Sequence, residues 1–279
     1  MLGKLLKHEW KAVWKVPTLM IGILMITAVT AGITFLLPIW DSEWIGLPLS
    51  AMMLVLLFYV AMIATSLGTL IYLAVRYYKS MYTDEGYLTH TLPVTARELL
   101  FSKIITMSAW NLIASIAVIL SMGVFFGIVM LSLATKESSF AVEAAEMIAE
   151  MGELYTSPYM EGFGAFCGST VLMTLVGSVG STMMIVGAID LGQMVRKHRI
   201  LGAIGAYYGI YSVLQVVMVI VMIPFMIRMA FEVEEVVEDM AIFSVYTPIF
   251  LIMSVIYVIV SVGLYFMSEY LVRRKLELE

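Results

Sequence analysis

The sequence predicts an all-α polytopic membrane protein with six transmembrane helices and both termini on the cytoplasmic side. Of its 279 residues, 62% are hydrophobic and only 13% are charged. A soluble globule of this length would need more polar surface than this composition supplies. The apolar residues run continuously instead of alternating, which favours helices over a transmembrane barrel. We expect residues 1–279 to form a single transmembrane domain.

Six apolar stretches are long enough to cross a hydrocarbon core, which takes about 20 helical residues. The first one follows a basic segment, as a signal peptide does. It continues for more than twenty residues without a clear cleavage site, so we expect a retained span. The predicted spans lie at residues 16–40, 48–75, 104–134, 162–191, 201–228 and 244–270.

The basic residues predict the orientation of these spans. Fourteen of the 16 Lys and Arg residues precede the first span, follow the sixth, or lie between spans two and three or four and five. Cytoplasmic loops carry the excess of Lys and Arg, so these segments are predicted to be cytoplasmic. Thirteen of the 21 acidic residues fall in the three outer loops, the longer two being residues 135–161 and 229–243.

The first 15 residues have the pattern of an amphipathic helix. We predict a helix in the inner membrane interface, with membrane lipid as a partner of its lysines. The alternative is a solvated basic tail that only sets the topology. The apolar face comprises Leu2, Leu5, Leu6, Trp10 and Val13, and the polar face Lys4, Lys7, His8, Lys11 and Lys15.

Acidic residues recur at helical spacing in both long outer loops, and each loop is predicted to contain a short amphipathic helix. The acids either take part in gating or substrate selection, or simply keep translocated loops soluble. The residues concerned are Glu143, Glu146, Glu150 and Glu153 in the first loop, and Val233, Val236, Val237 and Met240 on the apolar face of the second.

The sequence contains no catalytic or metal-binding motif. It has no G-x-x-x-x-G-K-[ST] phosphate loop, no H-E-x-x-H and no G-x-S-x-G, and its single cysteine, Cys167, excludes a cysteine cluster. We therefore expect no catalytic residue, metal or cofactor in this chain, and no nucleic-acid partner. Asp190 lies near the inner end of its span, where we expect it to pair with Arg196 or Lys197 or to face the cytosol.

Mildly polar residues inside the spans allow two interpretations. They serve interhelical packing together with nearby glycines, which we favour, or they line a substrate path. The residues are Thr170, Thr174, Ser178 and Thr182 along one side of span four, Asn111 in span three and Gln215 in span five; the glycines are Gly164, Gly168, Gly177, Gly180, Gly205 and Gly209.

The polar loop at residues 76–103 is predicted to be an ordered cytoplasmic element. Residues 84–86 indicate a turn or helix start, and Pro93 would end a short helix that follows it. Thr95 and Glu98 match the capping box, so a new helix should begin at Ala96. The alternative is an ordinary topogenic loop with a helix cap.

This loop resembles the corresponding loop of type-two ATP-binding-cassette (ABC) permeases. The likeness extends to the basic N-terminus, the six spans, the turn at residues 197–202 and the basic tail at residues 273–276. The chain most resembles small permeases encoded beside a separate ATPase in Firmicute-like bacteria. This resemblance implies a location in a bacterial plasma membrane. The matching residues are Asp84-Glu85-Gly86, Leu92-Pro93-Val94-Thr95, Arg97-Glu98-Leu99-Leu100 and Lys103.

The resemblance implies an ATP-driven exporter in which this loop carries a coupling helix that docks onto a separate ATPase subunit. ATP and magnesium would bind that subunit, and two permease chains, identical or different, would pair with two ATPases. The substrate is not identified by the sequence. One alternative is a non-transporting membrane sensor or assembly protein that binds a cytosolic partner through the loop; a membrane-embedded enzyme is less favoured. The docking residues would be Asp84, Glu85, Gly86, Tyr87, Leu88, Thr89, His90 and Leu92, supported by Arg97 and Glu98.

Overall fold

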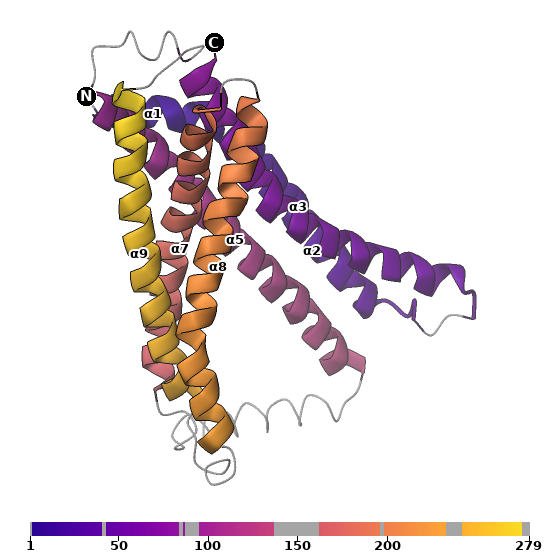
Figure 1. The fold of residues 1–279 in the computed structure, drawn as a ribbon. Coiled ribbons are helices and arrows are strands. Elements are labelled where there is room, and N and C mark those ends of the chain that lie inside the picture. The colour runs from indigo at the N-terminus through magenta and orange to yellow at the C-terminus, as the bar shows by residue number, and fades with distance from the viewer. Residues whose placement is uncertain are drawn as a thin grey trace. The chain divides into compact units, whose positions relative to one another are not determined.

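The structure, a computed structural model, describes residues 2–40, 43–83, 86, 95–136, 162–195, 198–232 and 242–274. These ranges contain helices and no strand, as the sequence predicts (Figure 1). The helices are α1 (Leu2–Val13), α2 (Lys15–Leu36), α3 (Gly46–Tyr82), α5 (Ala96–Lys136), α7 (Phe163–Gly192), α8 (Arg199–Glu232) and α9 (Ile242–Arg274).

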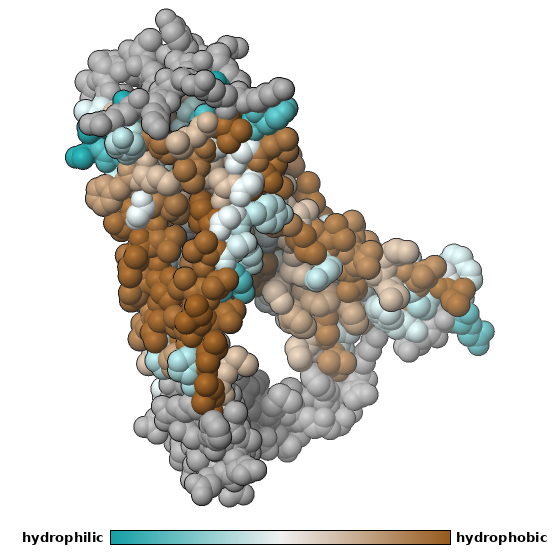
Figure 2. All heavy atoms as spheres, in the orientation of Figure 1, coloured by the Kyte–Doolittle hydropathy of each residue, from teal (hydrophilic) through white to brown (hydrophobic). Residues whose placement is uncertain are grey.

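Six of these helices, all except α1, are long and apolar enough to cross a membrane. This agrees with the predicted number of spans, and the chain is a multi-pass membrane protein on this evidence of length and composition. Hydrophobic side chains cover most of the helical surface visible in Figure 2, as expected for helices that face lipid.

The helix ends differ from the predicted span ends, most clearly around the loop at residues 76–103. Helix α3 continues to Tyr82 and α5 already begins at Ala96, so only residues 83–95 separate them. Hydropathy marks the apolar part of a helix, whereas its hydrogen bonds continue into the polar interface. Conversely, α2 ends at Leu36, before the predicted residue 40, because Leu37 precedes a proline and adopts an extended conformation.

Helix α1 confirms the amphipathic pattern of the N-terminal segment. Its lysines are exposed, whereas Val13 is buried. The position of this helix in the membrane interface stays a prediction. The helices predicted within the two long outer loops lie outside the described residues.

The chain divides into two compact units. Unit 1 consists of Met1–Leu6, Ala74–Ser108 and Gly152–Glu279, and unit 2 of Lys7–Leu73 and Ala109–Met151. The core of unit 2 includes Leu24 of α2 and Phe58 of α3, and the Phe58 ring stacks on Phe125 of α5 with 5.1 Å between centroids. Small residues at Ala28 and Ala31 complete the buried face of α2.

Helix α7 is the most buried of the spans in unit 1. In its most apolar stretch 56% of the residues are buried, compared with 6% in α8 and 11% in α9. Close packing against α9 depends on glycine, because a Cβ at Gly180 would lie 2.4 Å from a ring carbon of Tyr257 and one at Gly187 would lie 3.0 Å from Leu264. One end of α7 and one end of α9 lie beside the ends of α3 and α5 within unit 1. The basic residues predict that these ends are cytoplasmic.

Candidate functional site at the ends of helices α3 and α5

A buried carboxylate on α7 holds the end of α3. Tyr77 donates its hydroxyl to Oδ1 of Asp190 across 2.9 Å, and Tyr82 donates to the same oxygen across 2.6 Å. All three side chains are buried, with Asp190 only 1% exposed. Two neutral hydroxyl donors compensate part of the cost of burying a carboxylate. The last turns of α3 are therefore tied to α7.

The expectation that Asp190 faces the cytosol is wrong. Its carboxylate is buried inside unit 1, where it accepts hydrogen bonds from two tyrosine side chains of α3. Ser268 of α9 lies beside the same carboxyl group. The alternative partners, Arg196 and Lys197, lie outside the described residues.

A buried lysine links α5 to the same end of α3. Lys103 is 3% exposed, and its Nζ donates to Oγ of Ser80 across 2.8 Å. The Ser80 hydroxyl in turn donates to the carbonyl oxygen of Tyr77 across 3.1 Å. The lysine therefore fixes α5 to the same helical turns that carry the tyrosines.

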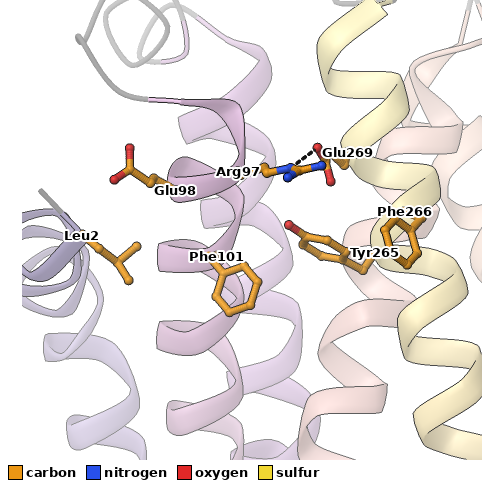
Figure 3. Close-up of a pocket in the computed structure, with 7 residues that line it drawn as sticks. All are labelled: Leu2, Arg97, Glu98, Phe101, Tyr265, Phe266 and Glu269. Carbon is orange, nitrogen blue, oxygen red and sulfur yellow. Dashed lines mark hydrogen bonds and ion pairs between the residues drawn. The ribbon is translucent and has the colours of Figure 1, made fainter.

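An ion pair joins the start of α5 to α9. Arg97 donates Nε to Oε1 of Glu269 across 2.5 Å, shown by the dashed line in Figure 3. Glu269 is the buried partner, with 7% of its side chain exposed, whereas 61% of the Arg97 side chain is exposed. Arg273, one turn further along α9, approaches the same carboxylate oxygen to 3.5 Å.

The predicted capping box is present at the start of α5. The Glu98 backbone amide donates to Oγ1 of Thr95 across 3.3 Å, and the Thr95 amide donates to Oε2 of Glu98 across 3.2 Å. These reciprocal bonds satisfy two amides at the helix start, so α5 begins at Ala96 as predicted. Local sequence spacing was sufficient to identify this feature.

Only three of the predicted docking residues are described: Gly86, Arg97 and Glu98. The Gly86 amide donates to the carbonyl oxygen of Thr83 across 2.7 Å, which agrees with the predicted turn. A Cβ on Gly86 would lie 2.5 Å from the carbonyl oxygen of Met81, so only glycine fits there. The other predicted docking residues, Asp84, Glu85, Tyr87, Leu88, Thr89, His90 and Leu92, lie outside the described residues.

A pocket of about 390 Å³ opens beside the Arg97–Glu269 ion pair. Arg97 and Glu98, which are adjacent in α5, point away from each other, and the ring of Phe101 lies between them one turn further along (Figure 3). The pocket is lined by Leu2, Arg97, Glu98, Phe101, Tyr265, Phe266 and Glu269.

The predicted substrate-path residues in α7 bond to their own helix. Thr170 donates to the carbonyl oxygen of Phe166 and Thr174 to that of Thr170, both across 2.9 Å. Ser178 and Thr182 make the same kind of bond and are buried. These contacts fit the packing interpretation without requiring a substrate.

The remaining two candidates lie on other helices, α8 and α5. Gln215 is exposed on α8, and Asn111 belongs to unit 2. Of the glycines, Gly180 allows close packing, whereas a Cβ at Gly205 or Gly209 would meet no atom within 4 Å. The GxxxG pair in α8 is therefore not packed against another described segment.

Polar contacts hold both flanks of residues 83–95 on membrane-spanning helices. Both flanks of this segment are held by polar contacts, one on α7 through Asp190 and the other on α9 through Glu269. Coupling between distant parts of a protein travels through such contiguous contacts. Sequence reasoning missed Tyr77, Ser80 and Tyr82; a cluster of hydroxyl side chains at the polar end of an apolar span was the available signal.

No protein-family profile, curated protein or solved structure matches this chain in sequence or fold.

Proposed function

We propose that this chain is the membrane-spanning subunit of an ATP-driven ABC exporter in the bacterial plasma membrane. The observation that carries the proposal is the double attachment of the segment at residues 83–95. Its preceding helix is held on α7 by the Tyr82–Asp190 hydrogen bond, and its following helix is held on α9 by the Arg97–Glu269 ion pair. A segment attached in this way can pass the movement of a bound protein to two spans.

The energy source is a separate ATPase subunit that binds ATP and magnesium. The chain contains no phosphate-loop sequence, so ATP hydrolysis by that route belongs to another polypeptide. Docking of the ATPase on residues 84–92 would push or pull the ends of α3 and α5. Movement of α7 and α9 then changes access to the substrate, whose chemical class is left open.

Pairing of two permease chains is part of the proposal. Gly205 and Gly209 present a face of α8 on which a Cβ would meet no described atom within 4 Å. Small residues four apart allow a second helix to approach closely in a membrane. The molecular mass of the purified complex, corrected for bound detergent, should correspond to two permease chains and two ATPases.

Co-purification in mild detergent tests the docking. The double substitution Asp84→Lys with Glu85→Lys reverses the charge of the predicted docking turn and is expected to abolish recovery of a phosphate-loop ATPase. The matched control is Glu234→Lys with Glu235→Lys, an adjacent acidic pair in a predicted outer loop, which should leave recovery unchanged. Membrane insertion should be normal in both variants.

Two results would contradict the proposal. The first is wild-type protein that never recovers an ATPase, and the second is equal loss of the ATPase with both charge reversals. A sensor or assembly protein would be distinguished by reconstitution in vesicles, because its partner would support no ATP-dependent movement of any tested lipophilic or amphipathic compound.

A further inference from the structure

The pocket beside the Arg97–Glu269 pair combines a charged level with an aromatic level. Arg97 and Glu98 lie in the first turn of α5, and Phe101 lies one turn further along. On α9, Glu269 likewise lies one turn from Tyr265. One helical turn spans about 5.4 Å, so charged groups and aromatic rings form two successive levels.

This order of groups matches the polarity gradient of a membrane interface. The charged level lies where α5 and α9 reach the predicted cytoplasmic surface, and the aromatic level lies toward the apolar parts of both spans. Phe101 is 48% exposed and Phe266 is 60% exposed, so both rings are available to an acyl chain. Phe101 and Tyr265 also contact each other edge to face, with 5.6 Å between centroids, which holds the floor of the pocket in place.

The pocket lining includes a positive charge on Arg97 and a negative charge on Glu98, which do not pair with each other. Arg97 uses Nε for Glu269, and its largely exposed guanidinium has further N–H donors. Glu98 uses Oε2 for the Thr95 cap, and its carboxylate and the Arg97 guanidinium lie on either side of Phe101 (Figure 3). A ligand that carries both a phosphate and a primary ammonium complements both side chains.

We propose that this pocket binds one inner-leaflet glycerophospholipid with a primary-amine headgroup. Its phosphate contacts Arg97, its ammonium contacts Glu98, and its acyl chain lies on Phe101, Tyr265 and Phe266. A quaternary ammonium headgroup has no N–H to donate to Glu98. An anionic headgroup without an amine leaves Glu98 without a cationic partner.

The size of the pocket favours a lipid over a folded partner. Small-molecule sites in proteins typically enclose about 300–1,000 Å³, and this pocket has about 390 Å³. The proposal does not depend on the exporter function, because it requires only the membrane and the residues that line the pocket.

Native mass spectrometry of the full-length chain tests this inference. Delipidated protein in detergent is mixed with an equimolar set of dioleoyl lipids that carry phosphoethanolamine, phosphocholine and phosphoglycerol headgroups. The wild type is expected to retain the phosphoethanolamine lipid preferentially. Glu98→Gln should lower that preference by about fivefold, since it removes one charge-assisted contact. Glutamine still closes a capping box, so the start of α5 is preserved.

Two further variants complete the experiment. Glu43→Gln removes an exposed carboxylate from unit 2 and should leave the preference unchanged. Phe266→Ala removes an exposed ring and should lower retention of all three lipids without changing their order. Equal retention of the three lipids by the wild type, or an unchanged preference in Glu98→Gln, would overturn the inference.

Discussion

Tyr82, the last residue of α3, donates its hydroxyl to Oδ1 of Asp190 across 2.6 Å, although 108 residues separate the two in the sequence. The bond connects the end of α3, where residues 83–95 begin, with the end of α7, the most buried span of unit 1.

Loss of the Tyr82 hydroxyl should weaken unit 1 and the proposed coupling. Tyr82→Phe removes one of the two tyrosine hydroxyls that donate to the buried carboxylate and should cost about 1 kcal/mol of unfolding free energy, measured by unfolding in mixed micelles. Tyr59→Phe is the matched control, because that ring is 60% exposed on the same helix.

The same pair of variants tests transmission. With Tyr82→Phe the ATPase should still co-purify, whereas the ATP hydrolysed per substrate moved should increase. Equal unfolding free energies for the two variants would show that the Tyr82–Asp190 bond contributes nothing to stability.

The Arg97–Glu269 pair should show energetic coupling in a double-mutant cycle. Arg97→Gln and Glu269→Gln each break the 2.5 Å contact, and the double variant should be more stable than the sum of the two single losses predicts. The expected coupling is modest because Arg97 is largely exposed and Arg273 still lies near the carboxylate. Strictly additive losses would mean that the two side chains do not stabilise each other.

Gly192 should not tolerate a side chain. A Cβ there would lie 2.5 Å from the backbone nitrogen of Ala203, where α7 and α8 approach each other. Gly192→Ala should therefore cost roughly 1–3 kcal/mol, measured by the same unfolding assay, because backbone atoms must shift. Gly177→Ala is the control on the same helix, since a Cβ there meets no atom within 4 Å. The control should be neutral or slightly stabilising.

Thiol labelling should report the predicted orientation. In a Cys167→Ser background, Glu43→Cys should react with a membrane-impermeant maleimide on intact cells, and Thr95→Cys should react only after permeabilisation. Both positions are exposed in the structure. Ser80 would be a poor choice, because it is 5% exposed and accepts a hydrogen bond from Lys103. Labelling of Thr95→Cys from outside would reverse the topology.

Sequence patterns among residues close together in the chain correctly predicted the number of spans and the start of α5. The six spans follow from the length of apolar runs, and the start of α5 follows from Thr95 and Glu98, three residues apart. Both are local properties, since a helix bonds its own backbone and a capping box closes within one turn. The spans predicted from hydropathy stop at residue 75 and start again at residue 104, short of the ends of α3 and α5, because hydropathy falls before helical hydrogen bonding stops.

Contacts between distant residues required the tertiary structure. Asp190 was expected to pair with Arg196 or Lys197 or to face the cytosol, yet it accepts hydrogen bonds from two tyrosines more than 100 residues away. Arg97 and Glu269 are likewise 172 residues apart. Nothing in the spacing of these residues identifies their partners, because partner choice depends on how α7 and α9 pack against the ends of α3 and α5. The sequence alone determined a six-span helical membrane protein with a capped helix after its polar segment. Only the tertiary structure decided that both sides of this segment are held by buried carboxylates, because burial depends on neighbours that the chain supplies from far away.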